Sequence, residues 1–263
     1  MSKIISIYGG NGSGKTTLAV NLAYNLANKG KVVGVVSTDF SKPTITGFLG
    51  MNITSEQPNW SYICNKGHEI KDVAQKFFVQ HPRYQNIFIL SVANDTNCLT
   101  YAGENQMDED DKVRNLYSHL QTSDFDYVIV DCVNDVNNLV STYALYYAEK
   151  IIHIINPTIQ GMIFCNSYES FLNKMRNKNT DNPIIHVANA DQNYVGISEF
   201  ESKIGLKFDF LLPYEKQALK AENDGIPLLE TFTPSLFSSG YPKKFEELVS
   251  KLINEKKVGE KDG

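Results

Sequence analysis

Long apolar runs are missing from this 263-residue chain, since no stretch approaches the roughly 20 residues needed to cross a bilayer. The N-terminus also lacks the basic, then apolar, then small-residue pattern of a secretory signal, so we expect a cytoplasmic location. Cysteine is scarce, and Cys64, Cys98, Cys132 and Cys165 form no C-x-x-C pair. Neither a disulfide framework nor a zinc site is indicated, and we expect these thiols to be reduced and mostly buried.

An excess of positive charge is missing as well. The formal net charge of −5 disfavours strong nonspecific DNA binding, although a local basic patch can exist within an acidic average. Hydrophobic residues make up 42% of the chain, which is enough for a full-sized buried core. With no internal repeat and no linker, residues 1–263 are predicted to form a single domain, in which residues from about 241 to 263 form a C-terminal helix and a polar tail.

Short β-branched runs alternate with helix-like segments along the chain. Strands are expected at Ile4–Tyr8, Val32–Ser37, Ile87–Val92, Tyr127–Asp131, Ile151–Asn156, Ile184–Asn189 and Phe208–Leu212. This alternation predicts an α/β fold with a doubly wound, mostly parallel sheet and helices on both faces. Apolar residues recur at helical spacing from Leu18 to Leu26, and Gly30 is a typical residue to end that helix.

A glycine-rich loop lies between the first strand and the first helix, and it matches the phosphate-loop pattern G-x-x-x-x-G-K-[ST]. The residues expected to bind a nucleotide are Gly9, Gly10, Asn11, Gly12, Ser13, Gly14, Lys15, Thr16 and Thr17. Glycines let successive backbone N–H groups face the phosphates, and the helix N-terminus adds partial positive charge. Lys15 is expected to reach the β- and γ-phosphates, and Thr16 to ligate magnesium.

Two aspartates at strand ends are the candidate acids of this site. The apolar run in "FDYVIVD" ends at Asp131, which we predict to be the second magnesium residue, beside Thr16. The second strand leads into a loop at Asp39, which is able to face the γ-phosphate. An alternative interpretation of Asp39 is an acid that merely ends a strand or caps a helix.

From Lys3 to about Leu248, the order of these parts resembles the ParA/MinD family of P-loop ATPases. "IIHVANAD" is similar to the family strand whose Asn contacts adenine, here Asn189, and "LLPYEKQALKAENDGIPLLE" is similar to the Pro-rich segment that closes over the base, here with Pro213. The resemblance implies an α/β P-loop fold that binds ATP and Mg²⁺ at the carboxyl ends of the strands.

The resemblance further implies slow hydrolysis, with Lys15 and Asp39 as catalytic residues. It implies a homodimer formed on ATP, and a protein activator or cargo, such as partition, pilus, secretion or conjugation machinery. This chain departs from the family at Gly10, where the family has a signature lysine that reaches across the dimer. We therefore expect a weak dimer, or a replacement cation such as Lys42.

Two other functional classes stay open on the sequence. Bacterial tyrosine kinases share the fold and also lack the signature lysine, but they end in a tyrosine cluster that this tail lacks. Tyr143, Tyr146 and Tyr147 are instead interpreted as a core or interface face. A nucleotide-binding scaffold with little hydrolysis is the third interpretation. The C-terminal helix is expected to pack on the sheet, with a membrane-surface helix as the alternative.

Overall fold

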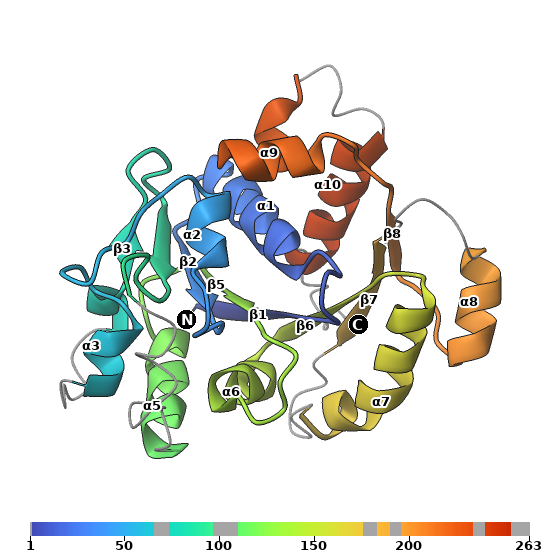
Figure 1. Cartoon of the computed structure of the whole chain (residues 1–263), viewed down its shortest axis with the longest axis horizontal. Coiled ribbons are helices and arrows are strands. Elements are labelled where there is room, and N and C mark those ends of the chain that lie inside the picture. The colour runs from blue at the N-terminus through green and yellow to red at the C-terminus, as the bar shows by residue number, and fades with distance from the viewer. Residues whose placement is uncertain are drawn as a thin grey trace, which may run out of the picture.

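The computed structural model describes residues 2–65, 74–96, 110–175, 183–189, 196–233 and 240–253. Within these ranges eight strands form one sheet in the order β3-β4-β2-β5-β1-β6-β7-β8 (Figure 1). The strands are β1 (Lys3–Tyr8), β2 (Val33–Ser37), β3 (Val79–Gln80), β4 (Ile87–Leu90), β5 (Tyr127–Asp131), β6 (Lys150–Ile155), β7 (Ile184–Asn189) and β8 (Phe210–Leu212). Every neighbouring pair is parallel except β3 and β4. The predicted doubly wound, mostly parallel α/β sheet is confirmed.

Each predicted strand is present, with its ends shifted by at most two residues. The sequence prediction missed β3, a two-residue antiparallel strand at the edge of the sheet. Such a short strand carries too few side chains to show an alternating pattern, and its pairing with β4 exists only in the folded chain.

Side chains alternate between the two faces of the sheet, as they must in an extended strand. In β1, Ile5 and Ile7 join one core cluster, whereas Ile4 and Tyr8 join the cluster on the opposite face. Both faces are therefore covered, which explains why the central strands are apolar at consecutive positions.

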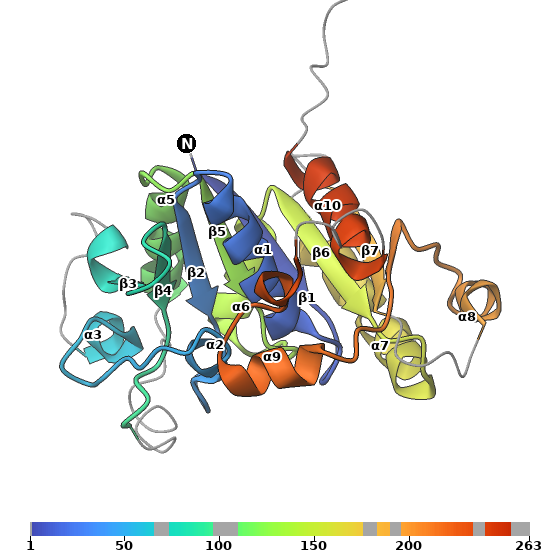
Figure 2. The same ribbon diagram turned by 90° about the horizontal axis from the view of Figure 1, so that it is seen from above.

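The first face is covered by α1, α9 and α10, with α2 packed between α1 and α9 at the margin (Figure 2). These helices are α1 (Lys15–Asn28), α2 (Thr44–Phe48), α9 (Ala218–Asp224) and α10 (Gly240–Ile253), with a short 3-10 helix, η3 (Leu228–Thr231). As predicted, α1 carries a buried apolar stripe, and Gly30 follows its end in a left-handed conformation with φ 77°.

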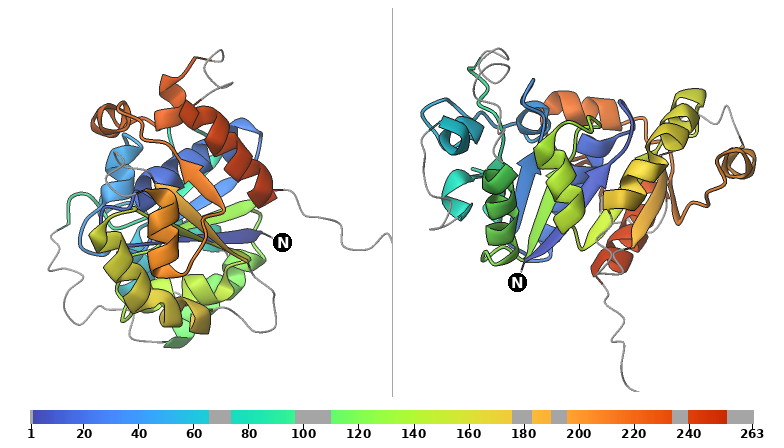
Figure 3. Two further views of the ribbon diagram at one scale, coloured as in Figure 1. Left: turned by 90° about the vertical axis from the view of Figure 1, so that its right-hand side faces the viewer. Right: turned by 90° about the horizontal axis from the view of Figure 1, so that it is seen from below.

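The second face is covered by α5, α6 and α7, the green to yellow helices in the right panel of Figure 3. The elements on this side are α3 (Trp60–Asn65), η2 (Ala74–Phe77), α5 (Asp110–Gln121), α6 (Leu139–Tyr147) and α7 (Ile159–Met175), and α8 (Ile197–Ile204) packs against α7. Cys132 and Cys165 are free and buried, as expected. Cys98 and the side chain of Cys64 lie outside the described residues.

The C-terminal helix α10 packs its apolar face into the core. Phe245, Leu248 and Val249 are fully buried in the same cluster as α1, so the expected packing on the sheet is confirmed. The face proposed for the alternative membrane contact is therefore occupied by the protein's own core. Across the described ranges, no helix has both the length and the apolar character required to span a bilayer.

Candidate functional site

The candidate site residues gather at the carboxyl edge of the sheet. The glycine loop follows β1, and the ends of the neighbouring strands lie in register, since Ile7, one residue before the end of β1, and Ser37, the last residue of β2, are both paired to Asp131 of β5. Asn189 ends β7. Because the strands are parallel, their carboxyl ends meet on one edge, which brings together segments that are more than a hundred residues apart in the chain.

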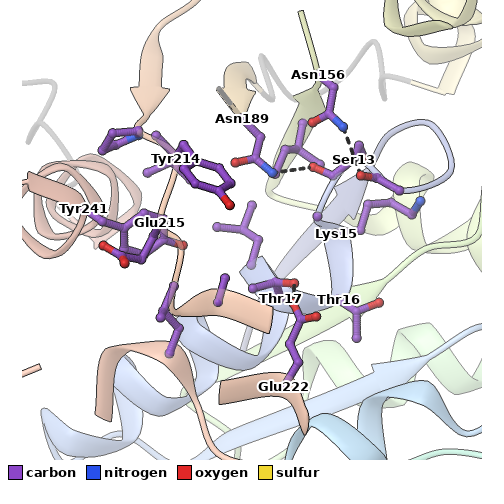
Figure 4. Close-up of a pocket in the computed structure, with 18 of the residues that line it drawn as sticks. Ser13, Lys15, Thr16, Thr17, Asn156, Asn189, Tyr214, Glu215, Glu222 and Tyr241 are labelled. Atoms are coloured by element: carbon purple, nitrogen blue, oxygen red, sulfur yellow. Dashed lines mark hydrogen bonds between the residues drawn. The ribbon is translucent and has the colours of Figure 1, made fainter. Parts of the chain in front are cut away.

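The loop conformation depends on glycine at its last position. Gly14 caps α1 with φ 93°, in the left-handed region that other residues rarely adopt. A side chain at this position would also lie 2.6 Å from the Nδ2 atom of Asn189. That amide donates to the carbonyl oxygen of Ser13 at 3.0 Å, so the end of β7 holds the loop in place (Figure 4).

Lys15 begins α1 and lies against the loop that precedes it. Its Nζ donates to the carbonyl oxygens of Gly9 at 3.0 Å and Gly10 at 2.9 Å. Burial lowers the pKa of Lys15, and the negative charge of Asp131 opposes that effect. The structure therefore places a half-buried cation beside the loop, where it can meet an anion.

Thr16 and Asp131, the two predicted metal residues, are in direct contact. The Thr16 hydroxyl donates to Oδ2 of Asp131 at 2.7 Å. Burial raises the pKa of Asp131 to about 6, against the effects of the Thr16 hydrogen bond and of the Lys15 charge. A hydroxyl and a carboxylate at this distance form a hard oxygen pair of the kind that Mg²⁺ prefers.

Asp39 lies in the loop after β2, half-buried and turned back on its own segment. Its Oδ1 accepts the backbone N–H of Ser41 at 2.8 Å. Burial has the largest effect on the pKa of Lys15, but two charges of this loop also act on that pKa. Asp39 raises it and Lys42 lowers it. Both side chains are therefore close enough to Lys15 to act on it electrostatically.

A cavity of about 390 Å³, which we call the loop cavity, extends from the glycine loop to β8 and α9 (Figure 4). Its volume falls in the range of about 300–1,000 Å³ that is typical of sites for small ligands and cofactors. At one end it is lined by Gly12 through Thr17, with Asn189 beside that loop, and at the other by Pro213 and Tyr214. Of the predicted site residues, Gly9, Gly10, Asn11, Asp39 and Asp131 do not line it.

Several lining residues were missed by the sequence prediction. Glu222 of α9 accepts a 2.5 Å hydrogen bond from the Thr17 hydroxyl, and Asn156 after β6 donates to the carbonyl oxygen of Gly12 at 3.0 Å. Tyr214 and Tyr241 also line the loop cavity. Tyr214 and Glu222 lie in the segment "LLPYEKQALKAENDGIPLLE" that was expected to close over the base, but their individual contacts, like that of Tyr241, depend on the return of the chain to the loop.

Gly10, the position of the missing signature lysine, faces α7. A Cβ atom there would lie 3.4 Å from the ring of Phe164, so a helix side chain lies against this part of the loop. Gly10 and Phe164 also line a second cavity, of about 350 Å³, together with Gly161 and Tyr168.

The tyrosines of α6 pack largely against α5. The Tyr143 hydroxyl donates to the carboxylate of Asp110, and Tyr147 stacks on Tyr117 with ring centroids 6.0 Å apart. Tyr146 is 43% exposed. Tyr143 and Tyr147 therefore belong to a helix interface, as interpreted from the sequence.

A family model described as an AAA domain (AAA_31) matches residues 2–186. Among solved structures, MinD of Pyrococcus horikoshii OT3, the septum site-determining protein complexed with Mg-ADP, has a TM-score of 0.71 at 19% identity and covers 97% of both chains. A ParA family ATPase of Chlorobium tepidum TLS has a TM-score of 0.74 at 16% identity, covering 95% of this chain and 99% of that one.

A third similar structure is the MinC:MinD cell division protein complex of Aquifex aeolicus, with a TM-score of 0.72 at 16% identity over 99% of both chains. No curated protein sequence matches the chain. At these identities the structural likeness shows a shared fold over nearly the whole of each chain.

Proposed function

The chain belongs to the AAA domain family (AAA_31) and has the fold of MinD and ParA ATPases, and from this we propose that it binds ATP with Mg²⁺ and hydrolyses it slowly as a switch that positions or assembles a cellular cargo. The observation that carries the proposal is the loop cavity. It joins a phosphate loop with Lys15 and Thr16 at one end to Pro213 and Tyr214 at the other, and Asn189 also lines it.

The two ends of the loop cavity suit the two ends of a nucleotide. Backbone N–H groups from Gly12 to Thr17, the start of α1 and the Lys15 ammonium favour phosphate charge. The opposite end offers the Tyr214 ring, which is 52% exposed, for stacking on a base, and Asn189 lines the same cavity beside the loop with an amide that is proposed to hydrogen-bond the base. The Mg-ADP held by the similar MinD supports this assignment.

Bound MgATP would supply the phosphoryl group and the cation that neutralises its charge. The chain's own groups bind and orient it: Lys15 holds the β- and γ-phosphates, and Thr16 with Asp131 holds the metal. Asp39 is proposed to orient the attacking water, since its charge already reaches Lys15. The burial of Asp131 and its hydrogen bond from Thr16 support these two residues as the metal pair.

A homodimer formed on ATP is part of the proposal, with a protein activator or cargo as the partner. The MinC:MinD complex among the similar structures supports a protein partner for this fold. Gly10 leaves the phosphate loop without the signature lysine, so the dimer is expected to be weak unless Lys42 serves in its place. The net charge of −5 does not favour DNA as the cargo.

Replacing Lys15 with Ala tests the nucleotide site. A charge-assisted contact of this kind contributes about 1.5–3 kcal/mol, so the ATP dissociation constant should rise roughly 10- to 150-fold. Lys29→Ala, which changes a half-exposed lysine paired with Glu246 just beyond the other end of α1, is the matched control and should leave affinity unchanged. Calorimetric titration with MgATP measures both variants.

Equal ATP affinity in wild type and Lys15→Ala would refute the nucleotide site. Release of inorganic phosphate by the wild-type protein separates the ATPase from the scaffold, because a scaffold binds MgATP without releasing phosphate. Label transferred from ATP to tyrosine would instead identify a kinase.

A further inference from the structure

Glu222 places a carboxylate on the wall of the loop cavity, between its two ends. The residue lies on α9 and is half-buried, and its Oε1 accepts the Thr17 hydroxyl at 2.5 Å. Figure 4 shows this pair between Thr16 on one side and Tyr214 on the other. In a nucleotide whose phosphates lie at the glycine loop and whose base lies at Tyr214, the sugar is the part nearest to this carboxylate.

The formal charges of the loop cavity are separated along its length. Among the described residues that line it, Lys15 is the one cation, and it lies at the glycine loop. The two carboxylates of the lining, Glu215 and Glu222, both act on Tyr241, whose pKa is raised most by burial and further by these two charges. A carboxylate repels phosphate but accepts hydrogen bonds from hydroxyl groups. This part of the cavity therefore suits an unphosphorylated sugar.

The Glu222 carboxylate has capacity for more than the hydrogen bond from Thr17. An ionised carboxylate offers about four lone-pair sites on two oxygens, and it donates none. The sugar of a ribonucleotide carries two hydroxyl groups, each of which is a donor. The other carboxylate of the lining is turned to its own segment, since Oε1 of Glu215 accepts the backbone N–H of Gln217 at 3.1 Å. Glu222 is therefore the better acceptor for a sugar hydroxyl.

The packing of α9 fixes the position of Glu222. Its neighbour Ala221 is 1% exposed and belongs to the same core cluster as α1. Gly225 ends α9 with φ 65°, and a Cβ atom there would lie 2.7 Å from the Cα atom of Gly50, so the end of the helix packs directly on backbone. Because the acceptor is already oriented, a hydroxyl that bonds to it loses little free energy in ordering the protein.

We propose that Glu222 recognises the sugar of the bound nucleotide, because its carboxylate accepts a hydrogen bond from a ribose hydroxyl. The loop cavity then prefers ribonucleotides to nucleotides whose sugar lacks hydroxyl groups. This inference rests on the proposed function, since it requires the phosphates to lie at Lys15 and the base to lie at Tyr214. It assigns a specificity-determining residue to that site from outside the phosphate loop.

Two nucleotides that differ only in the sugar hydroxyls test this inference. The full-length protein is titrated calorimetrically with ATP and with 2′,3′-dideoxyATP, each in the presence of Mg²⁺. The phosphates and the base are the same in both, so the ratio of the two dissociation constants isolates the sugar. We expect ATP to bind at least tenfold more tightly, because the dideoxy compound leaves a charged acceptor without its hydrogen bond.

Two variants of Glu222 change this ratio. Glu222→Ala should bind the two nucleotides within about twofold of each other, and because alanine favours helix the variant should keep the circular dichroism of the wild type. Glu222→Gln keeps the size of the side chain and one acceptor oxygen, and its preference for ATP should fall to a few-fold because a neutral acceptor forms the weaker hydrogen bond. The ratio is compared rather than the affinity, since loss of a negative charge strengthens the binding of both triphosphates.

Two other acids provide matched controls. Asp224→Ala removes a carboxylate from an exposed position of the same helix that does not line the loop cavity. Glu215→Ala removes the other carboxylate of the lining. Both variants should keep the wild-type preference for ATP over the dideoxy compound.

Equal binding of ATP and 2′,3′-dideoxyATP by the wild type would overturn this inference and leave the proposed nucleotide site intact. A wild-type preference that is unchanged in either Glu222 variant would also overturn it. Loss of the preference in Glu215→Ala, with Glu222→Ala unaffected, would assign the sugar contact to Glu215 instead. Binding of neither nucleotide would refute the proposed function itself, and this inference with it.

Discussion

Adding one methyl group to Gly9 should disrupt both the fold and the loop. A Cβ atom at Gly9 would lie 2.2 Å from the carbonyl oxygen of Ile154 and 2.8 Å from the hydroxyl oxygen of Ser13. Carbon and oxygen atoms normally approach no closer than about 3.3 Å, so roughly 1 Å of movement is needed. Ile154 is backbone of β6, held between β1 and β7, and it cannot move aside as a side chain can.

The magnitude follows from this rigidity. Overpacking in a well-packed region costs about 1–3 kcal/mol, and we expect Gly9→Ala to reach about 3 kcal/mol because a central strand must yield. For a chain of this size, that corresponds to a fall in Tm of roughly 6–12 °C. If the loop moves instead of the strand, stability is retained in part and ATP affinity falls.

Gly10→Ala is the matched control, one residue further along the same loop. A Cβ atom there meets only the Phe164 side chain, at 3.4 Å, which is an ordinary contact. Reduced freedom of the unfolded chain contributes a small gain, so the change in stability should stay under about 1 kcal/mol. Thermal and urea unfolding followed by circular dichroism, with MgATP titration of each variant, measures both effects.

Equal Tm and equal ATP affinity of Gly9→Ala and Gly10→Ala would show that the contact between β6 and Gly9 does not constrain the loop. The prediction is equally refuted if Gly10→Ala is the more damaging of the two, because the close approach of β6 to Gly9 would then not govern this part of the loop.

Two further predictions concern the aspartates. Asp39→Ala should lower kcat while the ATP dissociation constant stays within a few-fold, because a group that orients water acts mainly in the transition state. Steady-state phosphate release measures kcat, and calorimetry measures the dissociation constant. Much weaker ATP binding by the variant would mean that Asp39 contacts ATP in the ground state. In metal-free protein the pKa of Asp131 is raised to about 6 from its ordinary 3.8, mainly by burial, so the native state binds this proton more tightly than the unfolded chain does. The free energy of unfolding of the wild type, relative to that of Asp131→Asn, should therefore be highest below about pH 4 and fall by about 3 kcal/mol as the pH rises past 6. Urea unfolding of both proteins in EDTA measures this difference. Parallel pH profiles of the two proteins would contradict the prediction.

The structure corrects or extends the sequence prediction mainly where distant segments meet. Glu222 contacts Thr17 across 205 residues of sequence, and neither residue carries a local sign of the other. The burial of α10 likewise depends on its place against the sheet, since the same apolar stripe would suit a membrane surface. His153 stands within an apolar run, and only the folded chain surrounds its ring with those of Tyr8 and Phe164.

The sequence by itself determined the strands, the first helix and the phosphate loop, because each depends on residues that are neighbours in the chain. Gly12 and Gly14, with φ of 69° and 93°, set the backbone of the loop locally, and apolar runs such as Tyr127–Asp131 mark buried strands wherever they are placed. Tertiary structure alone decided which side chains complete the loop cavity. Strand order brings β6, β7 and β8 beside the loop, and that order arises from packing across the whole sheet, which no local pattern contains.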